Sequence, residues 1–230
     1  MKYIKLFEDF SDKVLDNLED IKWIIVSFCD DRISYKLLSN MNLTILPIKF
    51  RNVSGNFSCS DNNLTSLEGC PETVGGEFGC SSNKLTSLEG SPKTVRYGFY
   101  CSNNNLTSMK GGPETVGGNF YCTGNELTSL EGCPETIGGT FDCKYNKLKS
   151  LEGGPKTVDG NLYCGGNNLT SLVGSPKTIG NVFSCVNNKN DLGRNSLKSL
   201  EGIGDVKGKI YSDVEEMSTE SLKKFSDFKK

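Results

Sequence analysis

The chain has 230 residues, a formal net charge of −2 and an isoelectric point near 5.4. This charge balance argues against a protein that binds nucleic-acid phosphates, because such proteins carry a strongly basic face. The chain contains no histidine, which excludes Ser–His–Asp and Cys–His catalytic pairs and zinc sites with histidine ligands. We therefore expect neither an enzyme nor a nucleic-acid partner.

Residues 1–37 predict a cap that covers one end of the fold. Residues 11–30 are expected to form a helix, because Ser11 can cap it and an apolar stripe follows at helical spacing. The stripe consists of Val14, Leu15, Leu18, Ile21 and Ile25. Residues 32–38 alternate between apolar and polar side chains, which predicts a first strand.

The N-terminal region shows neither a secretory signal nor a membrane span. Residues 1–10 mix basic, acidic and apolar side chains and have no continuous apolar segment. The longest apolar run, at residues 23–28, is far shorter than the roughly 20 residues that a membrane helix needs. We expect a cytoplasmic protein with no membrane contact.

Residues 38–203 are dominated by one unit that recurs every 21 residues. Its marker is a cysteine, found at Cys59, Cys80, Cys101, Cys122, Cys143, Cys164 and Cys185. An asparagine follows three positions later, at Asn62, Asn83, Asn104, Asn125, Asn146, Asn167 and Asn188. A fixed period of this length predicts a solenoid, in which each repeat forms one coil that packs on the next.

The order of residues within one unit predicts the shape of a coil. An aromatic residue or leucine two positions before the cysteine alternates with exposed positions, which indicates a strand with one buried face. The asparagine is expected in the turn after this strand, bonded to the backbone of its own and adjacent coils. Glycine and proline later in the unit predict short, non-helical returns. The predicted fold is a solenoid of about eight coils with a parallel β-sheet on one face.

Two segments carry a resemblance to a known family. Residues 78–85 (FGCSSNKL) and 120–127 (FYCTGNEL) resemble the LxLxxNxL core of leucine-rich repeats, with phenylalanine and cysteine in place of the first two leucines. The nearest variety is the short bacterial repeat of type III secreted ubiquitin ligases, whose catalytic domain has no counterpart here. The sequence of the repeat unit is also similar to that of uncharacterised repeat proteins of large tailed bacteriophages. These resemblances imply a leucine-rich-repeat-like fold over residues 38–203 and, for a phage product, a place in the host cytoplasm.

The regular pattern is broken near its end. About seven residues, 189–195, interrupt the seventh unit before the pattern resumes at residues 196–202. An inserted loop can carry function or can be a neutral addition, and both interpretations stay open. Residues 204–230 predict a C-terminal cap with a strand at 206–211 and a short helix.

The ten cysteines admit three interpretations: disulfides, a metal site, or buried free thiols. Equivalent side chains of a solenoid all point the same way, so we favour a row of buried thiols, which behave as small hydrophobic groups. A linear row does not supply the tetrahedral arrangement that a thiolate metal site requires, and we expect no metal or cofactor. Cys70 and Cys133 fall outside the row and are expected to be incidental.

The exposed positions of the predicted strand indicate where a partner would bind. Tyrosine is concentrated just before the cysteines of the middle units, and the predicted site consists of Tyr100, Tyr121, Asp142, Tyr145 and Tyr163. Exposed tyrosine on a rigid sheet suits recognition, although the tyrosines could also simply cover the sheet. We expect a monomeric, non-catalytic scaffold that binds another protein. The alternatives are a carbohydrate- or surface-binding module and a structural, virion-associated protein.

Overall fold

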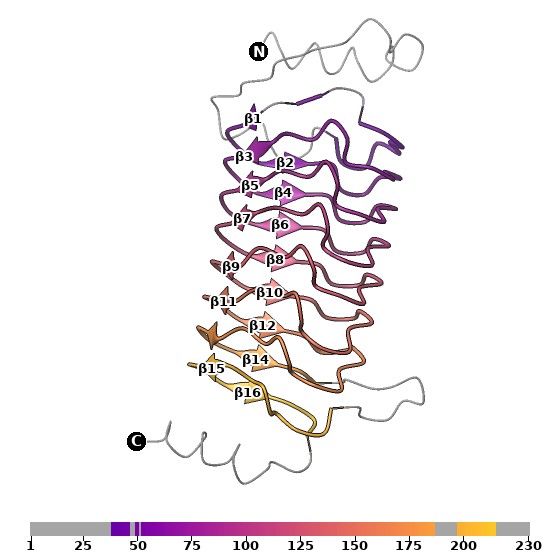
Figure 1. The fold of residues 1–230 in the computed structure, drawn as a ribbon. Helices are drawn as coiled ribbons and strands as arrows, with labels where there is room; N and C mark the ends of the chain where they lie inside the picture. The colour runs from indigo at the N-terminus through magenta and orange to yellow at the C-terminus, as the bar shows by residue number, and fades with distance from the viewer. Residues whose placement is uncertain (1–37, 47–48, 51, 187–196, 215–230) are drawn as a thin grey trace, which may run out of the picture.

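The computed structural model describes residues 38–46, 49–50, 52–186 and 197–214 (Figure 1). No helix occurs in these ranges. Several predicted features lie outside them, namely the N-terminal helix, nearly all of the first strand, Asn188, the insertion at 189–195 and the C-terminal helix.

The described chain is a parallel β-solenoid in which each coil contributes two very short strands. One eight-stranded sheet, called here sheet A, holds β1 (Asn52–Val53), β3 (Thr73–Val74), β5 (Thr94–Val95), β7 (Thr115–Val116), β9 (Thr136–Ile137), β11 (Thr157–Val158), β13 (Thr178–Ile179) and β15 (Asp205–Val206). The second, sheet B, holds β2 (Phe57–Ser58), β4 (Phe78–Gly79), β6 (Phe99–Tyr100), β8 (Phe120–Tyr121), β10 (Phe141–Asp142), β12 (Leu162–Tyr163), β14 (Phe183–Ser184) and β16 (Ile210–Tyr211). In Figure 1 the coils stack from β1 and β2 at one end to β15 and β16 at the other.

Sheet A differs from the prediction of a sheet on one face with short returns elsewhere. Its strands are Thr–Val or Thr–Ile pairs in most coils, and two residues are too few for an alternating pattern to stand out in the sequence. The branched side chain of Val95 points into the core while Thr94 is exposed. Thr94 pairs with Thr115 and Val95 with Val116 in the next coil, so the 21-residue period holds both sheets in register.

The extra residues near the C-terminus do not break either sheet. Thr178 of β13 pairs with Asp205 of β15, and Phe183 of β14 pairs with Ile210 of β16. The predicted strand at 206–211 is therefore observed as two strands joined by a turn, one in each sheet. The longer last coil keeps the parallel pairing of the coils before it.

The core is a set of stacked rows filled from both sheets and from the turn that follows sheet B. Phenylalanine and cysteine enter it from sheet B, valine or isoleucine from sheet A, and two leucines per coil from the turn. Phe99 is fully buried, and its ring stacks on Phe78 at 5.1 Å and on Phe120 at 5.0 Å between centroids. Because each coil buries its apolar edge on its neighbours, the apolar rows are continuous along the solenoid.

The predicted asparagine ladder is confirmed from Asn62 to Asn167. Asn104 shows the pattern: its Nδ2 donates to the carbonyl of Cys101 in its own coil at 3.2 Å and to that of Cys80 in the preceding coil at 3.1 Å. Its Oδ1 accepts from the N–H of Leu85 at 3.0 Å. The same three bonds recur at Asn83, Asn125, Asn146 and Asn167. The ladder thus satisfies backbone groups that the buried turn would leave without partners.

A glycine ends the turn on the far side of each coil. Gly111 has a φ of 82° and forms a tight turn in which the N–H of Gly112 bonds the carbonyl of Met109 at 2.9 Å. A Cβ atom at Gly111 would lie 2.5 Å from the backbone nitrogen of Glu89 in the preceding coil. Both the left-handed backbone and the close approach of neighbouring coils require glycine here.

Candidate interaction surface

The cysteine row lies inside the molecule. The seven cysteines of the row are buried as free thiols, and several donate weakly to a carbonyl of the next coil, as Cys143 does to Tyr163 at 3.5 Å. Burial raises the pKa of the thiols from Cys80 to Cys185 in this row, to about 12 at Cys185. Among the described residues, no group of three or more Cys, Asp or Glu side chains could hold a metal ion.

Cys70 and Cys133 lie closer to this row than the sequence suggested. The side chain of Cys70 is buried beside Cys59 and Cys80, and desolvation, followed by the influence of these two thiols, raises the pKa of its own thiol. Cys133 is half-buried as a residue and packs against the core near Cys101 and Cys122. Four other coils have glycine or serine at this position, and the last coil has Ile203, which also packs against the core.

We expect the native protein to hide its thiols from a thiol reagent. The thiolate is the reactive form, and desolvation keeps these groups protonated at neutral pH. Reaction with Ellman's reagent at pH 7.5 should therefore be slow for the folded protein and fast in denaturant. A Cys29→Ser variant removes the one cysteine outside the described residues from the count. Rapid labelling of several thiols in the native variant would contradict the buried row.

The outward face of sheet B carries most of the predicted binding residues. Tyr100, Tyr121, Asp142 and Tyr163 are the second residues of β6, β8, β10 and β12, and all four are half-buried. Their strands pair in register, with Tyr100 opposite Tyr121 and Asp142 opposite both Tyr121 and Tyr163. The four side chains therefore form one row across the coils, which we call the tyrosine row.

Contacts within the tyrosine row hold its side chains in place. The rings of Tyr100 and Tyr121 meet edge to face at 5.3 Å between centroids. The Tyr100 hydroxyl donates to Oε1 of Glu77 at 3.0 Å. Desolvation, together with this bond and the Glu77 charge, raises the pKa of Tyr100 to about 12. The hydroxyl therefore stays protonated throughout the physiological range.

A charged pair occupies the centre of the face. Lys144 Nζ lies 3.2 Å from Asp142 Oδ2 and 5.2 Å from the centre of the Tyr163 ring. The ammonium thus bridges a carboxylate and an aromatic face, an arrangement that neutralises Asp142 and orients Tyr163. Sequence reasoning named neither Lys144 nor Glu77. Lys144 directly follows a cysteine of the row, and Glu77 lies three residues before one. These fixed positions in the repeat unit could have identified both residues.

Tyr145 lies in the turn after β10 and is the most exposed of the predicted residues. Its side chain is 61% exposed, and its φ of 53° is left-handed, as in the equivalent Gly124 and Gly166. A Cβ atom at Gly166 would lie 2.5 Å from the Tyr145 ring, so the ring rests over that glycine. Asp61, Ser82 and Asn103 have the same left-handed backbone at this position, so it belongs to the turn of every coil, and only the bulky ring distinguishes Tyr145.

These features define a class of protein: a repeat solenoid with two parallel sheets, a buried asparagine ladder and a buried cysteine row. Comparison of the chain with protein-family models, curated proteins and solved structures found no match. The part of the chain that the structure describes has no helix long and apolar enough to cross a membrane.

Proposed function

We propose that this protein is a non-catalytic scaffold that binds another protein through the outward face of sheet B. The observation that carries the proposal is the tyrosine row with Lys144 and Tyr145 beside it. Tyrosine supplies a large contact area and a hydroxyl at a small entropic cost, and such residues dominate binding energy at protein interfaces.

Preorganisation supports this role. The row stands on a sheet whose strands pair with a neighbouring coil on both sides, and its rings and charges are already in mutual contact. Side chains that are fixed before binding lose little conformational freedom when a partner arrives. The rigid face can therefore use most of its contact energy for affinity.

The leucine-rich-repeat relationship belongs to the same proposal. It is supported by the parallel strand followed by an asparagine that bonds the neighbouring coil. A source among large tailed bacteriophages, action in the host cytoplasm and a monomeric state complete the proposal. Mass spectrometry that compares purified phage particles with infected-cell lysate would test the phage source and the action in the host cytoplasm.

The test removes the rings from the row. Changing Tyr100, Tyr121 and Tyr163 together to serine should weaken partner binding at least about thirtyfold, because each ring is a candidate hot spot. The free energy of unfolding should change by less than about 1.5 kcal/mol, as for surface substitutions. Affinity capture from host lysate, followed by titration of the captured partner, measures the first quantity and urea unfolding the second.

A matched variant changes three exposed charges in another row to serine, namely Lys110, Glu131 and Glu152. It should bind the partner as the native chain does. If the tyrosine variant binds normally, the face is not the binding site. If it instead loses more than about 3 kcal/mol of stability, the tyrosines serve to cover the sheet.

A further inference from the structure

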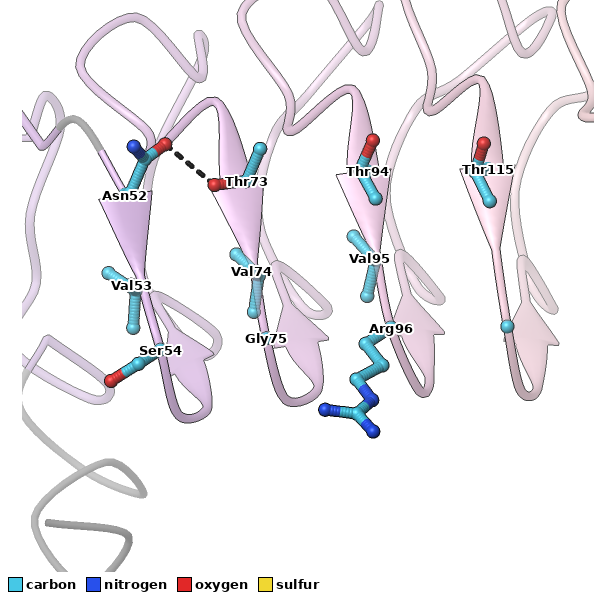
Figure 2. A pocket seen from close by; sticks show the side chains of 11 residues that line it. Asn52, Val53, Ser54, Thr73, Val74, Gly75, Thr94, Val95, Arg96 and Thr115 are labelled. Atoms are coloured by element: carbon cyan, nitrogen blue, oxygen red, sulfur yellow. Dashed lines mark hydrogen bonds between the residues drawn. The ribbon is translucent and has the colours of Figure 1, made fainter. Parts of the chain in front are cut away.

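The outward face of sheet A carries a second surface feature, separate from the tyrosine row. A shallow groove with a volume of about 670 Å³ crosses β1, β3, β5 and β7. Exposed threonines line it in β3, β5 and β7, with Asn52 at the same position in β1, and Figure 2 shows Thr73, Thr94 and Thr115 at the same height on neighbouring strands. Parallel pairing spaces these hydroxyls by about 4.8 Å from coil to coil.

A departure from the repeat places a cation in this groove and an aromatic ring beside that cation. The strands of sheet A are followed by Gly75–Gly76 in one coil and Gly117–Gly118 two coils later, but by Arg96–Tyr97 in the coil between them. Figure 2 shows Arg96 extending from the end of β5, where β3 has Gly75. Because the two adjacent coils have glycine at the position of Arg96, no side chains flank its guanidinium there.

Arg96 has no anionic partner among the described residues. Its guanidinium carbon lies 5.5 Å from the centre of the Tyr97 ring, and Tyr97 itself is 53% exposed. The nearby Lys93, in contrast, pairs with Glu114 at 3.7 Å. Among the described residues that line the groove, Arg96 alone carries a charge, and an arginine fork is suited to a planar oxyanion such as a carboxylate.

We propose that the sheet A groove binds a linear oligosaccharide that carries carboxylate groups. The Thr94 and Thr115 hydroxyls can both donate to and accept from sugar hydroxyls, and Thr73, which donates to Asn52 Oδ1, can still accept. Arg96 binds a carboxylate, and the exposed Tyr97 ring offers an apolar face to a sugar ring. The groove is open and spans four strands, which suits an extended chain of sugars better than a compact small molecule.

The probes are hexamers of galacturonate and of mannuronate, titrated by calorimetry into the full-length protein. We expect at least one of them to bind, and binding to fall at least tenfold when its carboxylates are converted to methyl esters. Arg96→Gln should weaken binding at least tenfold. Thr94→Val, which keeps the shape but removes a hydroxyl, should weaken it a few-fold.

Two further variants keep the result interpretable. Replacing Arg96 and Tyr97 together by glycine restores the Gly–Gly pair of adjacent coils, so the chain should fold normally and lose binding. Lys93→Gln, outside the groove, should change affinity less than twofold. The proposal is overturned if neither hexamer binds, if the methyl esters bind equally well, or if Lys93→Gln weakens binding as much as Arg96→Gln.

Discussion

The protein should lose its fold in mildly alkaline solution, at about pH 10, under reducing conditions. Eight buried thiols have a pKa raised above the ordinary value of 9.0, with desolvation as the largest cause in each case. They are Cys70, Cys80, Cys101, Cys122, Cys133, Cys143, Cys164 and Cys185.

The direction of the effect follows from proton linkage. At pH 8 and below the thiols are almost fully protonated in both the folded and the unfolded chain, and they contribute little to the pH dependence. Above pH 9 the unfolded chain releases thiol protons while the folded chain retains them, so the free energy of unfolding falls as the pH rises toward the folded pKa values. At one unit above 9 each thiol lowers it by about 1.4 kcal/mol, and the eight together by about 11 kcal/mol. That loss is comparable with the whole stability of a typical domain.

Urea unfolding at half-unit steps from pH 7.5 to 9.5, with a phosphine reductant, measures this slope. A variant with Cys70→Ser and Cys133→Ser supplies the control, because serine already occupies the same position at Ser91 and Ser175. With six thiols in place of eight, its extrapolated loss at pH 10 should be smaller by about 3 kcal/mol. Equal slopes for the two proteins would show that groups other than these thiols cause the loss of stability at alkaline pH. A flat profile would mean that the thiols are not buried.

The repeat made part of this architecture predictable. Cysteine and asparagine recur at fixed positions, and a residue that is kept in phase through a solenoid must meet the same environment in every coil. The burial of Cys101 and the bonds of Asn104 to two coils follow from that phase. Neither required knowledge of the three-dimensional path of the chain.

The features that were missed depend on contacts that period alone does not encode. The Thr–Val pairs form strands only because neighbouring coils bring identical pairs into register, which a two-residue pattern cannot signal. Cys70 and Cys133 face inward because the glycine turn before them redirects the chain. The groove that Arg96 lines is formed by residues of four coils, so the sequence of one coil does not reveal it.

The asparagine ladder predicts the second large effect. Asn104→Ala should lower the free energy of unfolding by about 3 kcal/mol. The change leaves the buried N–H of Leu85 without the Asn104 oxygen as its acceptor. The Cys80 and Cys101 carbonyls each lose one donor but keep another, from Asn83 and Asn125 respectively. The orphaned N–H therefore costs more than either weakened carbonyl.

This sharing of carbonyls makes the ladder cooperative. In a double variant, Asn104→Ala with Asn125→Ala, the Cys101 carbonyl loses both side-chain donors, so the destabilisation should exceed the sum of the single changes by about 1 kcal/mol.

Asn105→Ala is the matched control for the ladder, since Asn105 is exposed and its backbone bond to Leu85 does not involve the side chain. Its effect should stay within about 0.5 kcal/mol, measured by urea unfolding at pH 7. Similar losses for Asn104→Ala and Asn105→Ala would show that water replaces the ladder bonds at little cost. Strict additivity in the double variant would show that each asparagine stabilises its own coil independently of the next.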